Sequence, residues 1–209
     1  MAATKLKIYN GANRELGERK LATLTDNAES RRVLDTMWDS EFIDEVLSAG
    51  QWNFAARSAL IDIDASVTPP FGYSNAFPKP SDWIRTLAIS EDEYFSTPLN
   101  EYEDEAGVWY SESDPLYAKW ISNAEDYGSD LSKWPANFRL YVETLLASRV
   151  CTRITQNEQK TVHLMRLAEK RLIKAKATDA MDEAVGRMPA GSWIRARRGG
   201  RNNGQRRGN

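Results

Sequence analysis

The chain has 209 residues, a length that suits one folded domain with room for an inserted lobe. Hydrophobic residues make up 41% and charged residues 28%, which predicts a folded core. No apolar run approaches the ~20 residues that span a bilayer, and residues 1–9 lack the apolar stretch of an export signal. The single cysteine excludes an intramolecular disulfide, which fits assembly in a reducing cytoplasm.

Charge is unevenly distributed along the chain. Residues 187–209 carry seven arginines and no acid, whereas residues 1–186 carry 21 basic and 30 acidic side chains, a formal −9. Residues 187–209 also contain five glycines and show no hydrophobic period. We therefore expect a flexible arginine-rich C-terminal arm that binds a negatively charged partner or a protein partner.

The first part of the chain predicts two helices. Residues 4–17 predict a short helix that ends near Gly17, and residues 28–49 predict a longer, continuous one that ends near Gly50. We expect Trp52 and Phe54 to pack back on the longer helix. Its apolar residues recur at three- and four-residue steps: Val33, Leu34, Met37, Trp38, Phe42, Val46 and Leu47.

The middle of the chain predicts short strands, because the apolar residues change to a period of two. The hairpin among them turns at Glu105-Ala106-Gly107, where glycine tolerates the bend. Pro78 and Pro80 should bar regular structure next to them. The expected extended segments are 59–63, 73–77, 83–89, the hairpin 98–111, and 116–121.

Two long helices are predicted after the strands. The first opens at Trp134-Pro135 and breaks at Gln156 or Asn157, and the second spans about 158–185. The basic residues of the second helix should form a solvated face opposite its apolar one. The apolar positions of this second helix are Val162, Met165, Leu167, Ala168, Leu172, Ile173, Ala175, Met181 and Val185.

This order of elements predicts an α+β fold that is mainly α. We expect residues 1–186 to form a bundle of about four helices, with a small antiparallel β lobe inserted at about 55–122. Residues 187–209 would form an extended C-terminal arm.

The sequence contains no recognisable set of catalytic or metal-binding residues. His163 is the only histidine, it has no Cys, Asp or Glu at metal-binding spacing, and no Gly-x-Ser-x-Gly elbow accompanies it. No nucleotide-binding loop occurs, and Cys151 lies in an apolar helical run that predicts a small buried hydrophobe. We therefore expect no metal, no cofactor and no enzymatic activity.

Two alternatives to a purely structural protein stay open. Acids such as Glu101, Glu103 and Glu105 could serve a paired-carboxylate hydrolase acting on the cell wall, although solvated turn acids are the simpler interpretation. The arginine-rich arm could track phosphates as a nucleic-acid-binding module. It could instead order on a protein partner, because it also carries the apolar anchors Met188, Trp193 and Ile194.

Several segments, taken in order, resemble the head-to-tail adaptor family of short-tailed bacteriophages, also called tail tubular protein A. The segment most similar to the family is Val46-Leu47-Ser48-Ala49-Gly50-Gln51-Trp52-Asn53-Phe54-Ala55. The resemblance covers roughly residues 5–180, and the arginine-rich arm departs most from it. The other matching segments are Leu16-Gly17, Leu21-Ala22-Thr23-Leu24, Ala28-Glu29-Ser30-Arg31-Arg32-Val33-Leu34, Pro80-Ser81-Asp82-Trp83-Ile84-Arg85, Trp134-Pro135-Ala136-Asn137-Phe138 and Leu145-Leu146-Ala147-Ser148-Arg149-Val150.

The resemblance implies a structural virion protein at the head-to-tail junction. It implies a homo-oligomeric ring of twelve subunits under the portal protein, with the β lobe toward the tail nozzle protein and genomic DNA passing through the channel. We expect a monomeric free subunit whose arm orders on the portal, and neighbour contacts in the ring that each bury well over ~1,000 Å². The candidate portal-binding residues are Met188, Trp193, Ile194, Arg195, Arg197 and Arg198.

Overall fold

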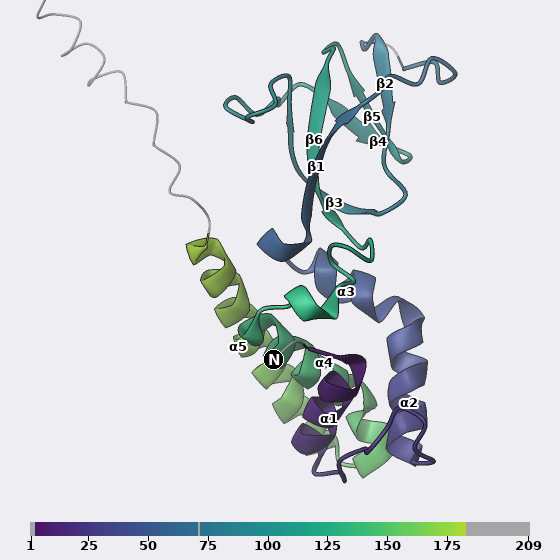
Figure 1. Ribbon diagram of the computed structural model, residues 1–209, viewed down its shortest axis with the longest axis vertical. Helices are drawn as coiled ribbons and strands as arrows, with labels where there is room; N and C mark the ends of the chain where they lie inside the picture. The colour runs from purple at the N-terminus through teal and green to yellow at the C-terminus, as the bar shows by residue number, and fades with distance from the viewer. Residues whose placement is uncertain (1–2, 71, 183–209) are drawn as a thin grey trace, which may run out of the picture.

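The computed structural model describes residues 3–70 and 72–182 as an α+β protein in which helices predominate (Figure 1). All six strands fall between α3 and α4 in the chain. Within the described residues, no helix is both long and apolar enough to cross a bilayer. The helices are α1 (Lys5–Leu16), α2 (Glu29–Met37), α3 (Ile43–Ser48), α4 (Ala136–Thr155) and α5 (Glu158–Met181). The strands are β1 (Ala56–Ile61), β2 (Asn75–Pro78), β3 (Trp83–Ser90), β4 (Glu103–Glu105), β5 (Val108–Ser111) and β6 (Leu116–Ser122).

Local capping sets the ends of the helices. The Thr4 hydroxyl accepts a hydrogen bond from the Lys7 backbone N–H (3.3 Å), and α1 ends at Gly17 in a left-handed conformation (φ 78°). Gln156 is also left-handed and turns the chain between α4 and α5, after which the Asn157 side chain caps α5. The helices predicted at residues 4–17 and after Pro135 are confirmed.

The continuous helix predicted over residues 28–49 is wrong in one respect. A kink within Trp38–Phe42 separates α2 from α3, because Ser40 and Glu41 leave helical geometry, with Glu41 at φ 60°. The Ser40 hydroxyl donates to the Met37 carbonyl (2.7 Å), which competes with the regular helix ladder. The kink turns α3 toward the strands and allows complete burial of its apolar residues Val46 and Leu47.

The core of the bundle lies around α4, against which α1, α2 and α5 pack. Phe138 is the centre of an aromatic cluster, with its ring centroid 4.6 Å from Trp52 and 4.9 Å from both Phe54 and Trp134. The indole N–H of Trp52 donates to the Val46 carbonyl (3.3 Å), so Trp52 does pack back on the preceding helix. Phe54 lies against α4 instead.

The strands form two antiparallel three-stranded sheets, with orders β1-β6-β3 and β2-β5-β4. The predicted hairpin is confirmed as β4 and β5 with its turn at Ala106-Gly107, and the first strand begins three residues earlier than predicted. Pro78 is the last residue of β2, an edge strand, where its missing N–H costs no ladder bond. A separate buried cluster holds the sheets together: Phe77, Ile89, Trp109, Leu116, Ala118 and Trp120.

The sheets lie at one end of the elongated molecule and the bundle at the other (Figure 1). Asp82, in the turn before β3, links β1 and β6 near the junction, because its carboxylate accepts hydrogen bonds from Arg57 of β1 (2.9 Å) and from Ser122 of β6. Partial burial acts to raise the pKa of Asp82, but these two hydrogen bonds outweigh it and hold the pKa below its ordinary value.

Candidate interaction surfaces

The residues considered for catalysis are not brought together. His163 is exposed on α5, and Cys151 is fully buried in α4, which confirms the prediction of a buried hydrophobe. In residues 3–70 and 72–182, no three His, Cys, Asp or Glu side chains lie close enough to hold a metal ion.

The acids of the strand region lie in exposed turns and edges. Glu101, Glu103 and Glu105 are all exposed. Asp92, in the preceding loop, accepts hydrogen bonds from the backbone N–H groups of Tyr94 (2.7 Å) and Ser96 (2.9 Å), which hold its pKa below the ordinary value. That carboxylate therefore stabilises the conformation of the loop.

The candidate portal-binding residues lie outside the described part of the chain. Met188, Trp193, Ile194, Arg195, Arg197 and Arg198 all follow Met181, the last residue of α5, beyond the end of the described range.

An exposed apolar stripe runs along α5. The sequence pattern predicted one apolar face against the bundle, but the apolar residues of α5 divide between two faces. Leu164, Ala168 and Ala175 are buried against the core, whereas the exposed fractions of four others are 46% for Val162, 46% for Met165, 69% for Ile173 and 81% for Met181. Val162, Met165 and Ile173 are spaced by three and eight residues and so share one side of the helix. We call Val162, Met165, Glu169, Ile173, Ala177 and Met181 the α5 stripe.

The α5 stripe is bordered by positive charge. Arg166, Lys170, Lys174 and Lys176 are all exposed, and Glu169 is the acid among them. Covering an exposed apolar side chain with a partner is favourable by about 25 cal/mol for each Å² of apolar surface removed from water. A helix with apolar residues inside a basic border therefore has the composition of a surface that binds a partner with acidic residues.

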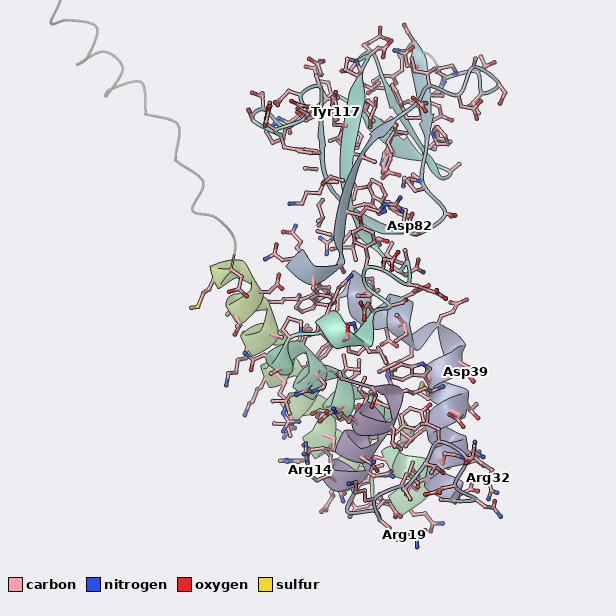
Figure 2. All side chains as sticks on the ribbon, in the orientation of Figure 1. Arg14, Arg19, Arg32, Asp39, Asp82 and Tyr117 are labelled. Carbon is pink, nitrogen blue, oxygen red and sulfur yellow. The ribbon has the colours of Figure 1, made fainter. Side chains whose placement is uncertain are left out.

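The kink between α2 and α3 carries an acidic segment, in which Asp39 pairs with Lys5 of α1 (3.6 Å). Residues 38–48 contain Asp39, Glu41, Asp44 and Glu45 and no basic residue. Asp39 and Glu41 are exposed at the kink between α2 and α3, and Figure 2 shows Asp39 on the edge of the bundle that lies away from α5. We call residues 38–48 the acidic segment.

A groove lies between α2 and α4 beside the acidic segment. Its volume is ≈ 310 Å³, and its apolar walls come from Val33, Met37 and Val150. The three arginines that line it are already engaged, because Arg32 (2.9 Å) and Arg153 (3.3 Å) pair with Glu29, and Arg149 pairs with Glu45. The groove could therefore accept an apolar side chain without meeting an unpaired charge.

Charge is segregated along the whole molecule. Residues 56–122 carry four basic and twelve acidic side chains, a formal −8. Residues 136–181, which include α4 and α5, carry nine basic and four acidic side chains, a formal +5. The strands and the last two helices therefore present opposite charges to partners.

Glu143 forms a buried ion cluster between α1 and α4. It is 5% exposed, and its carboxylate lies 3.2 Å from Arg14 and 3.7 Å from Arg139. Burial raises the pKa of Glu143 above its ordinary value, and the neighbouring arginines oppose that rise. Because it is paired inside the bundle, we interpret this group as structural.

The α5 stripe could not be found by sequence reasoning, because periodicity alone does not say which of two apolar faces the bundle covers. A scan of the chain against protein-family models gives no match, and neither does a comparison with curated proteins.

Proposed function

We propose that this chain is a structural subunit of a ring that joins the portal of a short-tailed bacteriophage to its tail nozzle. The observation that supports this proposal best is the α5 stripe. Ile173 and Met181 are mostly exposed on a helix whose other exposed residues are largely charged. Such side chains favour a protein that works by contact with other subunits.

The elongated shape supports the same proposal. The bundle and the strand region lie at opposite ends (Figure 1), so that one subunit could contact two different partners. In the proposed assembly the portal contacts the bundle and the arginine-rich residues 187–209, and the nozzle contacts the strands.

The charge of the strand region fits a DNA channel. A formal −8 over residues 56–122 would repel the phosphate backbone. A channel wall of like charge does not retain the DNA that it must release.

The test is binding to the portal ring encoded by the same genome. The two purified proteins are mixed and separated by size, and we expect the chain to migrate with the portal at a fixed ratio. A variant that ends at residue 186 should lose most of this binding. If the full-length chain does not migrate with the portal ring, the proposal is wrong.

The alternative is a nucleic-acid-binding module, and the seven arginines of residues 187–209 favour it. It requires a DNA affinity that falls steeply with salt and disappears when residues 195–209 are removed. The adaptor proposal instead expects that removal to weaken portal binding. Measuring both affinities on the same deletion variant separates the two functions.

A further inference from the structure

We infer that the α5 stripe of one copy binds the acidic segment and the adjoining groove of the next copy. This inference adds a contact surface to the proposed function, and it rests on the part of that function in which the subunits form a ring. It names the two surfaces through which neighbours would meet.

The last turns of α5 and the acidic segment lie on opposite sides of the bundle. α5 and α2 both pack against α4; in Figure 1, α5 begins near the lower end of α2 and crosses the bundle, so that its last turns lie at the edge opposite α2, while Asp39 lies on the α2 edge in Figure 2. Two different surfaces on opposite sides of one subunit allow a heterologous contact, in which each copy uses its α5 stripe on one neighbour and its acidic segment on the other.

The two surfaces also lie at the same height along the molecule. Toward the strands, Asp179 of α5 accepts from the Asn53 backbone N–H (3.0 Å), and Asp44 of α3 accepts from Asn123 (2.9 Å). At the far end, Glu29 of α2 pairs with Arg153 near the end of α4, close to where α5 begins. Both surfaces therefore run in the same direction from the far end toward the strands.

The residues along the α5 stripe and those along the acidic segment and groove are chemically complementary. Lys170, Lys174 and Lys176 lie in the half of α5 nearer the strands, and Asp39 and Glu41 lie beyond the end of α2 nearer the strands. The other half of α5 carries the exposed Val162 and Met165, and the groove lies along α2. The groove supplies apolar walls from Val33, Met37 and Val150. The lysines of one copy would face the acids of the next copy, and the apolar side chains of α5 would face the apolar walls of the groove.

The geometry favours a ring over a two-fold dimer. Neighbours that meet at equal heights are related by rotation about an axis roughly parallel to the long axis of the molecule, and repeating that rotation closes a ring. Two copies of α5 facing each other would instead place their lysines together, and like charges across an interface cost several kcal/mol.

Engineered thiols test this contact directly. In a Cys151→Ser background, Ser40→Cys places a thiol in the acidic segment and Ala177→Cys places one on the α5 stripe; both positions are exposed, and neither change removes a charge or a large apolar side chain. At ~0.5 mM, where weak contacts are populated, a short bis-maleimide should join the double variant into dimers, trimers and longer multimers. Equal mixing of the two single variants should stop at dimers.

The matched control is the pair Ser40→Cys and Ala65→Cys, which places the second thiol in an exposed loop after β1. We expect its cross-linked fraction to be lower by about tenfold, as for random encounters. Cross-linking of the Ser40–Ala177 pair no better than this control would overturn the inference. Equally efficient dimers from Ala177→Cys alone would also overturn it, because they indicate a two-fold contact.

The outcomes separate this inference from the proposed function. If the chain binds the portal ring but the Ser40–Ala177 pair does not cross-link above its control, the named contact is wrong and the adaptor function stands. If the pair cross-links into long multimers but the chain does not bind the portal, the contact stands and the adaptor function is wrong.

Discussion

Gly11 occupies a place in α1 where a larger residue would meet a buried carboxylate. A Cβ atom built at Gly11 would lie 2.1 Å from the Cδ of Glu143. Glu143 cannot move away freely, because Arg14 (3.2 Å) and Arg139 (3.7 Å) hold it. Glycine is a poor helix former, but at position 11 it is a packing requirement.

The first prediction follows from this contact. An exposed Gly→Ala change inside a helix usually stabilises by about 1 kcal/mol, but we expect Gly11→Ala to lower the free energy of unfolding by about 1–3 kcal/mol, because overpacking outweighs helix propensity. Urea unfolding measures the change. In a Glu143→Ala background the same substitution should be neutral or stabilising; an equal loss in both backgrounds would contradict the explanation.

Asp82 gives a prediction for pH. Its folded pKa lies below the ordinary value, so its contribution to stability is complete above the ordinary pKa of an aspartate, about 3.9. That contribution is lost as the pH falls through the lowered folded pKa. We expect Asp82→Asn to lower the free energy of unfolding by about 1–3 kcal/mol at pH 7.

The pH dependence supplies the control for Asp82. As the pH falls below the ordinary aspartate pKa of about 3.9 and through the lowered folded pKa, the difference between wild type and Asp82→Asn should shrink, because the wild-type carboxyl becomes protonated and loses its charge. Thermal unfolding from pH 2.5 to 7 measures it. A difference that stays constant over this range would show that the charge of Asp82 does not stabilise the fold.

At the scale of elements, the last turn of α5 is held by the segment that leads into β1. The Asn53 backbone N–H donates to the Asp179 carboxylate (3.0 Å), and the Asn53 side chain donates to the Asp179 carbonyl (2.8 Å). That carbonyl also accepts from the Asp182 backbone N–H (3.1 Å), which closes the last turn of the helix. Asn53 therefore joins the helical bundle to the strands.

The third prediction concerns this end of α5. Asn53→Ala removes one hydrogen bond of about 0.5–1.5 kcal/mol, so hydrogen exchange of the backbone amides at 178–181 should accelerate by about threefold to tenfold. The exposed Asn100→Ala should leave these amides unchanged. If both variants exchange alike, the link between Asn53 and α5 does not stabilise the helix end.

For the whole molecule, the segregation of charge decides which faces can meet. The acidic segment and the basic border of the α5 stripe lie on opposite sides of one bundle, so attraction acts between copies. Attraction between exposed charges is screened over about 8 Å at physiological salt. Self-association should therefore depend on ionic strength.

The fourth prediction uses charge reversal. Lys170→Glu with Lys174→Glu should weaken self-association by about tenfold or more, because like charges would then face Asp39 and Glu41. Adding Asp39→Lys and Glu41→Lys to the same chain should restore it. The control Arg19→Glu with Lys20→Glu changes the net charge equally in an exposed loop. Sedimentation velocity at low and high salt measures all four proteins at ~0.5 mM, where the weak contact between otherwise monomeric subunits is populated; equal weakening by the control would indicate that net charge alone is responsible.

The sequence by itself determined the elements and the fold class. The spacing of hydrophobic residues changes from a helical period to a strand period and back again. Gly17, Pro135 and Gln156 mark the positions at which a helix ends, starts or is followed by a turn. These signals are local, because periodicity and backbone preferences act within a few residues. The burial of Cys151 followed from the apolar run around it in the same way.

Only the tertiary structure decided which apolar residues of α5 stay exposed, where the second helix kinks, and which charged surfaces lie opposite one another. The kink at Ser40 and Glu41 carries no Gly or Pro signal in the sequence. The α5 stripe depends on how far the bundle wraps around α5, a property of residues distant in sequence. The two surfaces proposed to meet are therefore visible only once the helices are packed.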